Sequence, residues 1–569
     1  MLAIAALLLS IAAAPQEIPA PRIDQTIEVE LVNVDVVITD KKGNRIKGLT
    51  REDFVIKENG RIQPITNFAE YRSGIQDVKV TSGVAAPAQS APQAQSAPPR
   101  KRTIVVFIER FKLPSFRVDP MFAAIRSTLR DVVRPGDDVA VYRWDDGLTE
   151  HLGFTGDPAK LDQALAEIEK QSVGVEANYI EMLRRSQELE AAFYKSLESS
   201  PGANKGGFAA AAREASEAEY FDEQNAALRQ LHRIRRKTFD LRMLMRTIGD
   251  SPGKKIVLMA THRLGLYAGA EYFMDGEVPP FLRGVLTTEP EREALMRTAN
   301  TYGVTLYPVY PAGLGWTPRV SALEGPREDI FAVRTGDDLG RSKRDNNILM
   351  NETASLNEIA QATGGMLAWG HKDIIQLMPR LEDDLDTYYS LAFRPAPGTK
   401  RGKIEIDTKD RRYVVRARRE YVARDANTRM EDRVVANLNR PVEGATIPLQ
   451  AEFGPYQRQS RYVWTVPLKI RIPVSALTAL AGDGGRVGEF SVYVAVGGSV
   501  SVLSDVQHRT QRFKITDDQA AQAEGAYFTY EFTLRVRPQA GRASIGVIDE
   551  VSKEFGAQVV DLPNFPTIQ

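Results

Sequence analysis

Apolar residues in the middle of the chain form two patterns that follow one another. Short continuous runs, such as Ile104–Ile108 and Val139–Trp144, are typical of buried strands. Between them, over 120–133 and 158–170, apolar residues recur every three to four positions, which is the period of an amphipathic helix. Strands that alternate with helices predict βαβ units and a mostly parallel sheet.

The same pattern continues beyond an interruption. It predicts further strands over 255–260, 304–310 and 366–369, and helices over 291–302, 356–363 and 374–387. Two insertions interrupt this α/β region, which we place at 102–395. Residues 175–247 are rich in Ala, Glu, Arg and Leu around a Gly/Pro break, which predicts a projecting helical hairpin with arms near 178–198 and 208–247. Residues 312–350 are polar and are expected to form a loop.

Strand patterns dominate on both sides of the α/β region. Residues 22–75 alternate apolar and polar positions and predict a small β-sandwich-like module, and 396–425 predict a β extension. Residues 426–569 carry short alternating strands at regular spacing, which indicates a C-terminal β-sandwich. Residues 76–101 are rich in Ala, Pro, Gln and Ser and are expected to be a linker.

The first residues and the overall composition bear on where the protein acts. Residues 1–20 contain an apolar run that ends on small residues, Ala12–Ala14, which fits a signal peptide although no Lys or Arg precedes the run. We therefore expect a secreted, periplasmic or cell-envelope protein, with no transmembrane span in the mature chain. The 569 residues are 43% hydrophobic and 26% charged, with 74 basic and 74 acidic side chains. This balance gives no attraction to nucleic acid, and the absence of Cys excludes thiol catalysis, Cys–zinc sites and disulfides.

The run Ile104–Ile108 ends on a carboxylate, Glu109, followed by Arg110 and a loop that carries Ser115. Open α/β sheets place ligand groups at the carboxyl ends of their strands, so this loop is a candidate binding surface. Thr261 and His262 follow another predicted strand and belong to the same candidate surface. A basic segment at 232–237 could bind anions, although such runs are usually solvated helix faces; its candidate residues are Arg233, Arg235 and Arg236.

Eight stretches, spread over most of 27–422, have a recognisable combination of sequence. They read VDVVITDKKGNRIKGLTREDFVIKENGRIQPITNFAEY (34–71), VVFIERF (105–111), RPGDDVAVYRW (134–144), GKKIVLMATHRLG (253–265), YGVTLYPVYPAGL (302–314), LNEIAQATGGMLAW (356–369), LEDDLDTYYSLAFRP (381–395) and RRYVVRARREYV (411–422). Together they resemble the von Willebrand factor A (VWFA) domain, and in particular the bacterial secreted VWFA-related proteins; the combination is more specific than any one stretch. The resemblance implies a six-stranded Rossmann-like sheet wrapped by helices, and adhesion or protein–protein contact in place of catalysis.

The resemblance also implies a metal site with a DxSxS loop and a Thr and an Asp from two other loops, in which oxygen ligands hold Mg²⁺. This chain departs from that pattern. Its loop reads ERFKL (109–113), with Glu for the Asp and neither Ser, and ATH (260–262) stands where the second Asp is expected. We therefore expect a degenerate site without metal. The alternative is a rearranged Mg²⁺ or Ca²⁺ site, for which the candidates are Glu109, Ser115, Asp145 and Asp146.

Catalytic motifs are missing from the sequence. The five histidines follow no metal-binding spacing, and no GxSxG elbow or GxxxxGK[ST] loop is present. The acidic residues Asp383, Asp384 and Asp386 are expected on a solvated helix surface. A hydrolase site hidden in 312–350 is the least favoured reading, because no nucleophile–base pair supports it. The sequence thus predicts a non-enzymatic protein-interaction or adhesion protein with no cofactor and an unidentified protein partner.

Overall fold

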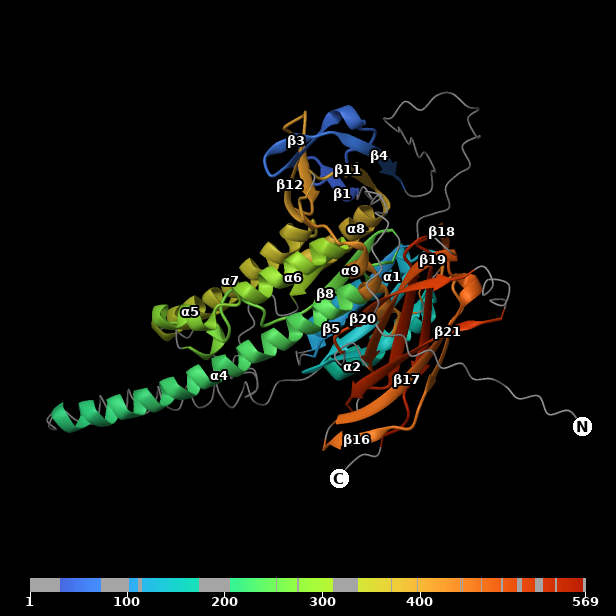
Figure 1. Ribbon diagram of the computed structural model, residues 1–569. Helices are drawn as coiled ribbons and strands as arrows, with labels where there is room; N and C mark the ends of the chain where they lie inside the picture. The colour runs from blue at the N-terminus through green and yellow to red at the C-terminus, as the bar shows by residue number, and fades with distance from the viewer. Residues whose placement is uncertain are drawn as a thin grey trace, which may run out of the picture.

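A computed structural model describes the chain in three regions, which Figure 1 shows as an upper β part, a central α/β part and, at the lower right, a second β part that is called the lower part. The predicted signal peptide, the linker, the first arm of the hairpin and the start of the second insertion lie outside the described residues. The described residues are 31–72, 102–110, 115–172, 205–251, 253–273, 276–310, 336–369, 371–396, 398–440, 442, 444–461, 463–482, 485–498, 504–516, 525–537 and 540–565.

The central part is built on a six-stranded sheet with the order β10-β9-β8-β5-β6-β7. Every pairing in it is parallel except that of β7, which runs antiparallel to β6 at one edge. The strands are β5 (Thr103–Glu109), β6 (Asp138–Trp144), β7 (Leu148–Thr155), β8 (Lys255–Ala260), β9 (Val304–Tyr310) and β10 (Ala368–Trp369). The predicted mixed α/β architecture with a mostly parallel sheet is confirmed.

Helices cover both faces of this sheet, which explains why β5 is buried along its whole length. Ile104, Val106 and Ile108 pack under α1 (Ser115–Val132), α2 (Pro158–Ser172) and α8 (His371–Asp386). The intervening Val105 and Phe107 pack under the helices of the other face. Those helices are α4 (Lys205–Ile248), α6 (Glu289–Tyr302) and α7 (Gly336–Thr363), with the short turns η2 (Ala270–Tyr272), η3 (Pro280–Leu282) and α5 (Arg283–Leu286) beside them.

The prediction of a loop over 312–350 is wrong for the second half of this range, because α7 begins at Gly336. The sequence of this helix is polar over its first turns, and Met350 further along it is exposed. Leu349 nevertheless packs in the core formed with α4 and α6. In the described part of this helix, Leu349 and the hydrogen bond of Arg344 to the Glu271 carbonyl at 2.8 Å thus supply tertiary contacts that the polar sequence does not indicate.

The upper part is formed by segments from both ends of the α/β region. Strand β1 pairs with β11 and β13, β11 pairs with β4, and β12 pairs with β2. One shared core contains Val34 and Ile56 together with Leu391 and Ile404. The strands are β1 (Val32–Thr39), β2 (Phe54–Glu58), β3 (Arg61–Gln63), β4 (Ile65–Tyr71), β11 (Tyr388–Phe393), β12 (Arg401–Thr408), β13 (Val414–Ala417) and β14 (Glu420–Val422), with the turn η1 (Arg51–Asp53). The segments predicted as a separate module and an extension thus share their sheets.

The acidic residues of α8 do not all lie on the solvated surface expected from sequence, because Asp384 is fully buried. Its carboxylate accepts hydrogen bonds from Arg416 Nη2 at 2.6 Å and Tyr307 Oη at 2.8 Å. Arg45, from the upper part, forms an ion pair with the same carboxylate. Asp384 therefore joins the α/β part to the upper β part. The spacing of acidic residues along α8 could not indicate this contact.

The lower part begins with a helix that the sequence analysis missed, α9 (Ala426–Asn437), where only strands were expected. Asp425 caps it by accepting a hydrogen bond from the Thr428 N–H at 2.7 Å. Two sheets follow and share one core. Their strands are β15 (Gln450–Phe453), β16 (Gln457–Ser460), β17 (Val463–Pro473) and β21 (Tyr527–Val536), and β18 (Leu480–Gly482), β19 (Gly485–Gly497), β20 (Gln507–Ile515), β22 (Arg542–Asp549) and β23 (Phe555–Asp561), with the turn η5 (Val474–Ala476).

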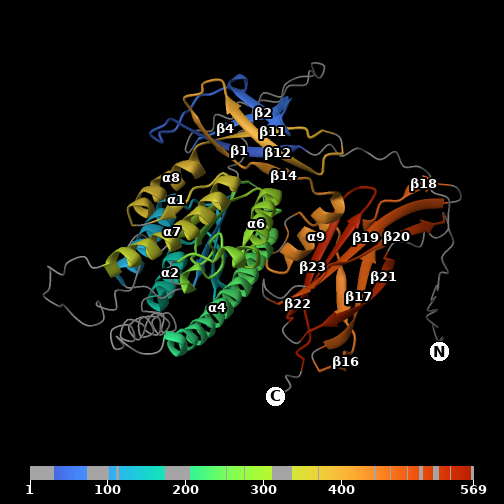
Figure 2. The same ribbon diagram turned by 90° about the vertical axis from the view of Figure 1, so that its left-hand side faces the viewer.

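Figure 2, turned by 90°, shows α9 between the α/β part and the sheets of the lower part. Among the described residues, none of the helices is both long and apolar enough to cross a membrane.

Candidate functional site

Two neighbouring parallel strands end at the same edge of the central sheet and bring the predicted residues together. Strand β5 ends on Glu109, and Ile108 pairs with Ala260 at the end of β8, just before Thr261 and His262. Because parallel strands present their carboxyl ends at one edge, this register places Thr261 beside Glu109. The Thr261 hydroxyl donates a hydrogen bond to Glu109 Oε2 at 2.7 Å, and the His262 N–H donates to the same oxygen at 3.1 Å.

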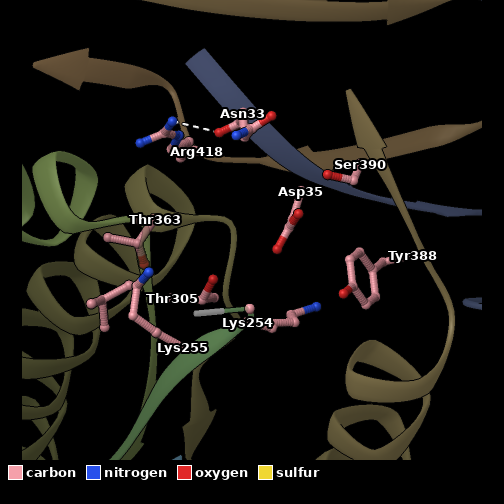
Figure 3. A pocket seen from close by; sticks show the side chains of 12 residues that line it. Asn33, Asp35, Lys254, Lys255, Thr305, Thr363, Tyr388, Ser390 and Arg418 are labelled. Carbon is pink, nitrogen blue, oxygen red and sulfur yellow. Dashed lines mark hydrogen bonds between the residues drawn. The ribbon is translucent and has the colours of Figure 1, made fainter. Parts of the chain in front are cut away.

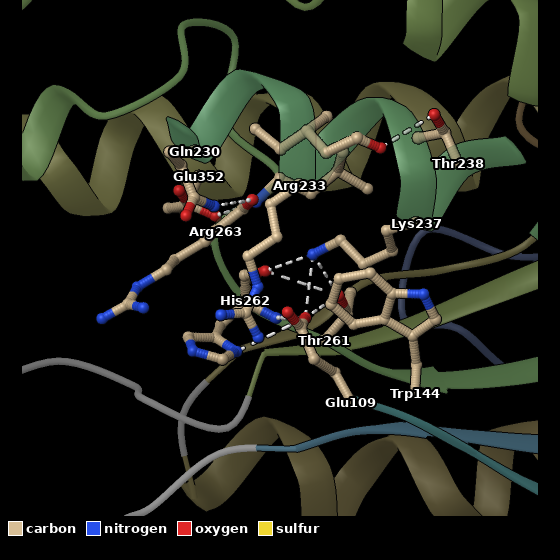
Figure 4. Close-up of polar contacts among 12 residues, drawn as sticks. Glu109, Trp144, Gln230, Arg233, Lys237, Thr238, Thr261, His262, Arg263 and Glu352 are labelled. Atoms are coloured by element: carbon tan, nitrogen blue, oxygen red, sulfur yellow. Dashed lines mark hydrogen bonds and ion pairs between the residues drawn. The ribbon is translucent and has the colours of Figure 1, made fainter. Parts of the chain in front are cut away.

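A lysine from α4 completes this cluster, as Figure 4 shows. The Lys237 ammonium lies 2.8 Å from Glu109 Oε2, 3.2 Å from Thr261 Oγ1 and 2.7 Å from the carbonyl oxygen of His262. Its side chain is 1% exposed and that of Glu109 is 2% exposed. The three N–H bonds of the ammonium therefore each have an oxygen to donate to, inside the protein.

The charges of this cluster balance one another. Burial alone would raise the pKa of Glu109, but the Lys237 ammonium, His262 and the hydrogen bonds from both hold the pKa of Glu109 well below its ordinary value. The His262 ring contributes from 3.4 Å, the distance between its Nδ1 and Glu109 Oε2. Glu109 is therefore an ionised carboxylate whose counter-charge is supplied by the chain itself.

This donor set does not fit the Mg²⁺ site that the VWFA resemblance implies. Mg²⁺ needs several oxygen ligands in an octahedral arrangement. Here the ammonium of Lys237 already binds the carboxylate of Glu109 and the hydroxyl of Thr261, the oxygens that a cation would require. In the described part of the chain, no group of three or more His, Asp or Glu side chains is placed to hold a metal ion.

The other carboxylates considered as metal ligands lie in ion pairs with arginine. Asp145 lies 2.8 Å from Arg110 and 3.6 Å from Arg143, and Asp146 lies 3.0 Å from Arg233. Both carboxylates belong to the loop between β6 and β7. Ser115, the first residue of α1, has a side chain outside the described part of the structure.

The basic segment of α4 is divided between two environments. Arg233 lies over the Trp144 ring, with 5.3 Å between its guanidinium carbon and the ring centre. Arg235 pairs with Glu291 at 2.9 Å, and the exposed Arg236 extends to the loop at Gly147. The segment is therefore not wholly the solvated face or anion site considered from sequence, because Lys237 is buried.

The sequence placed Lys237 only in the basic segment 232–237 and did not indicate its pairing with Glu109, although a signal for burial was present. Leu231, Ile234, Thr238 and Leu241 are buried and recur at helical spacing on α4. Lys237 follows Ile234 by three positions, so it belongs to this buried stripe. A basic residue on a buried stripe requires a partner, which here is Glu109.

Trp144 and Glu352 are two further buried polar groups near the cluster. The Trp144 indole N–H donates to Asp240 Oδ2 at 2.9 Å. Glu352 on α7 accepts a hydrogen bond from the Leu264 N–H at 2.8 Å, two residues beyond His262. Burial, and then the nearby Glu271 carboxylate, raise the pKa of Glu352 to about 8.

We expect the Glu352→Gln variant to be more stable than the unchanged protein at alkaline pH. A folded-state pKa of about 8, against an ordinary value of 4.5, means that the folded protein retains a proton that the unfolded chain loses. The stability of the unchanged protein should therefore fall as pH rises from about 4.5 to 8, by up to about 1.4 kcal/mol per pH unit. Glutamine keeps the acceptor for Leu264 and removes this loss.

Urea unfolding at a series of pH values measures the effect. The matched control is Glu293→Gln, whose carboxylate is 55% exposed on the neighbouring helix α6 and should leave the pH dependence unchanged. Parallel pH profiles for Glu352→Gln and the unchanged protein would contradict the assignment of a protonated Glu352.

Comparisons with known proteins do not assign a family. No protein-family model and no curated protein matches the chain. Solved structures similar to parts of it include a vWF domain of the type V pili tip protein Mfa5 from Porphyromonas gingivalis, with 15% identity, a TM-score of 0.11, and coverage of 14% of this chain and 28% of that one. This chain thus spans less than a third of that structure.

Two others cover more of the chain. The PilB minor pilin from Streptococcus sanguinis has 9% identity and a TM-score of 0.24, covering 64% of this chain and 89% of that one. A von Willebrand factor type A protein from Catenulispora acidiphila has 9% identity and a TM-score of 0.22, covering 66% and 75%. At these TM-scores the likenesses do not establish a shared fold, so function must be argued from the site itself.

Proposed function

We propose that this chain is a non-enzymatic protein-binding protein of the VWFA type that binds its partner without a divalent cation. The observation that carries this proposal is the ammonium of Lys237 among Glu109, Thr261 and the His262 carbonyl. A tethered positive charge at this place neutralises the carboxylate permanently. The loop edge is then fixed in one state, whereas a metal site would change with the supply of cation.

The recognition surface that we propose has two parts. One is the loop face formed by 109–115 and by Thr261 and His262. The other is the insertion at 175–247, of which α4 is described, with Arg233, Arg235 and Arg236 on it. Figure 1 shows α4 extending well beyond the sheet that it covers. Its first buried side chain among those described is Ala227, so residues 221–226 add little to the core of the α/β part.

We propose that the protein acts outside the cytoplasm, because residues 1–20 have the pattern of a signal peptide. The boundaries that we propose are 22–75 for the N-terminal β module, 76–101 for the linker, 102–395 for the VWFA-like domain, 396–425 for the β extension and 426–569 for the C-terminal β-sandwich. The pairing of β1 with β13 and of β2 with β12 supports treating the first module and the extension as one folded unit, which β11, from the end of 102–395, also joins.

Thermal unfolding of residues 22–569 tests the metal-independent function. We expect the same midpoint in EDTA and in millimolar Mg²⁺, Ca²⁺ or Mn²⁺, because a ligand raises the midpoint only when it binds the folded state. Glu109→Gln serves as the control variant, since it removes the carboxylate of the cluster. A rise with one cation in the unchanged protein that Glu109→Gln abolishes would replace this proposal by metal-dependent adhesion.

A further inference from the structure

A polar cavity lies at the opposite edge of the central sheet, where the strands begin. It measures about 210 Å³ and lies between the start of β8 and β9 and the strands of the upper β part. Figure 3 shows the side chains that line it. The lining includes Asp35 from β1, Lys254 and Lys255 at the start of β8, Arg418 after β13, Thr305 from β9 and Ser390 from β11.

The lining carries more positive than negative charge. It holds three basic side chains, those of Lys254, Lys255 and Arg418, and one acidic side chain, that of Asp35. In Figure 3 the Asp35 carboxylate points into the cavity from above, towards Lys254. One negative charge faces three positive charges, so two positive charges lack a counter-ion within this lining.

Backbone oxygens, and not carboxylates, accept the hydrogen bonds of the basic groups. The Lys255 ammonium donates to the Ser251 carbonyl at 3.1 Å, and the Lys254 ammonium donates to the Asp384 carbonyl. Arg418 Nη2 donates to the Asn33 carbonyl at 2.6 Å. Carbonyl groups satisfy N–H donors but do not neutralise a positive charge, so the excess charge remains.

Burial affects these groups strongly. It is the largest cause that lowers the pKa of Lys254 and of Lys255 to about 8 each, and of Arg418 to about 10. The Asp35 carboxylate opposes the shift in all three cases and the Asp250 carboxylate opposes that of Lys255, while neighbouring arginines add to it. An anion in the cavity would therefore relieve repulsion that the protein alone leaves in place.

We propose that this cavity binds a small oxygen dianion, of the phosphate or dicarboxylate class, between Lys254, Lys255 and Arg418. A water molecule takes about 30 Å³ in the liquid, so a space of about 210 Å³ accommodates a phosphate-sized anion together with several waters. The lining carries a net two positive charges, which match the charge of a dianion. Ser390 and Thr305 add hydroxyl groups to the lining, which can donate to its remaining oxygens.

The site is separate from the loop edge of the proposed partner surface, because it lies at the amino ends of strands whose carboxyl ends carry Thr261. It does not depend on the proposed function. It also joins two parts of the fold, since Asp35 and Arg418 come from the upper β part and the two lysines from the central sheet. A bound dianion should therefore strengthen the contact between these parts.

The test is to titrate the full chain with inorganic phosphate and, separately, with malonate. Calorimetry measures binding, and thermal unfolding measures the change in midpoint. Sodium chloride at matched ionic strength is the blank. We expect saturable binding and a raised midpoint. Lys255→Gln and Arg418→Gln should each weaken binding about tenfold or more. Asp35→Asn should tighten it, because that carboxylate repels the anion. Lys57→Gln, which removes a lysine paired with Asp407 on the surface of the upper part, should change nothing.

Binding of phosphate alone identifies a phosphoryl ligand, and binding of malonate alone identifies a dicarboxylate; either supports the site. Circular dichroism establishes that each variant is folded, and Arg418→Lys, which keeps the charge, should retain most of the affinity. No saturable binding of either anion would overturn the inference. So would binding that Lys255→Gln, Arg418→Gln and Asp35→Asn all leave unchanged, which would mark an adventitious ion only.

Discussion

Replacing Lys237 by methionine should lower the free energy of unfolding by about 3–5 kcal/mol, because it leaves the Glu109 carboxylate buried without its counter-charge. Glu109 is 2% exposed, and its partners besides Lys237 include the neutral Thr261 hydroxyl, the His262 N–H and the His262 ring. Methionine has a similar length, so loss of packing contributes little. Urea unfolding followed by tryptophan fluorescence and circular dichroism measures the change.

The double variant Lys237→Met with Glu109→Gln separates this charge effect from packing. It removes both charges, so it should recover a large part of the stability that Lys237→Met loses. Arg235→Met is the matched control on the same helix, since Arg235 is 51% exposed and its pair with Glu291 is expected to contribute less than about 1 kcal/mol. Equal losses for Lys237→Met and Arg235→Met would show that Lys237 is not the buried counter-charge of Glu109.

Asp384→Ala, at the other end of the α/β part, should also lower the free energy of unfolding by about 3–5 kcal/mol. Asp384 is fully buried and is the shared partner of Arg45, Arg416 and Tyr307. Burial and the adjacent Arg416 already lower the pKa of Arg45 to about 10, which shows that its charge is held at a cost. Without the carboxylate the two guanidinium groups would lose the anion that they share.

The adjacent Asp383 is the comparison for this prediction, because its carboxylate also supports the charge of Arg45 but is exposed on the same turn of α8. Solvent screens an exposed carboxylate, so Asp383→Ala should lower the free energy of unfolding by less than about 1 kcal/mol. Combining Asp384→Ala with Arg45→Met should cost less than the sum of the two single changes, because the second removes one of the stranded charges. Strict additivity would show that Asp384 and Arg45 do not interact in solution.

Local sequence patterns were sufficient to predict most helices and strands of the α/β part. The continuous apolar run before Glu109 forms β5, and all residues of this strand are buried. The strand predicted over 304–310 has the same bounds as β9. Two helices were misjudged. The polar start of α7 and the whole of α9 lack a long apolar stripe, and they are held by a few buried contacts such as Leu349 and Met430.

The candidate site was predicted only in part, for a reason of distance along the chain. Glu109 and Thr261 could be brought together from sequence because both follow buried strands of one sheet. Lys237 is separated from Glu109 by 128 residues and lies on a different element, so no spacing rule connects them. The same holds for the cavity at the amino edge, where Asp35 and Lys255 come from opposite sides of the linker.

The interleaving of β1 with β11 has a consequence for how the protein is made. The Leu49 N–H donates a hydrogen bond to the Tyr389 hydroxyl across 340 residues of chain. Ribosomes add about 5–20 residues per second, so the first strands wait roughly 20–70 s for their partners. During that interval β1 and β4 have unpaired edges that can associate with other chains. Strands β1 and β4 thus remain unpaired while the whole α/β part between them and β11 is synthesised, which is the period in which their edges are most open to association with other chains.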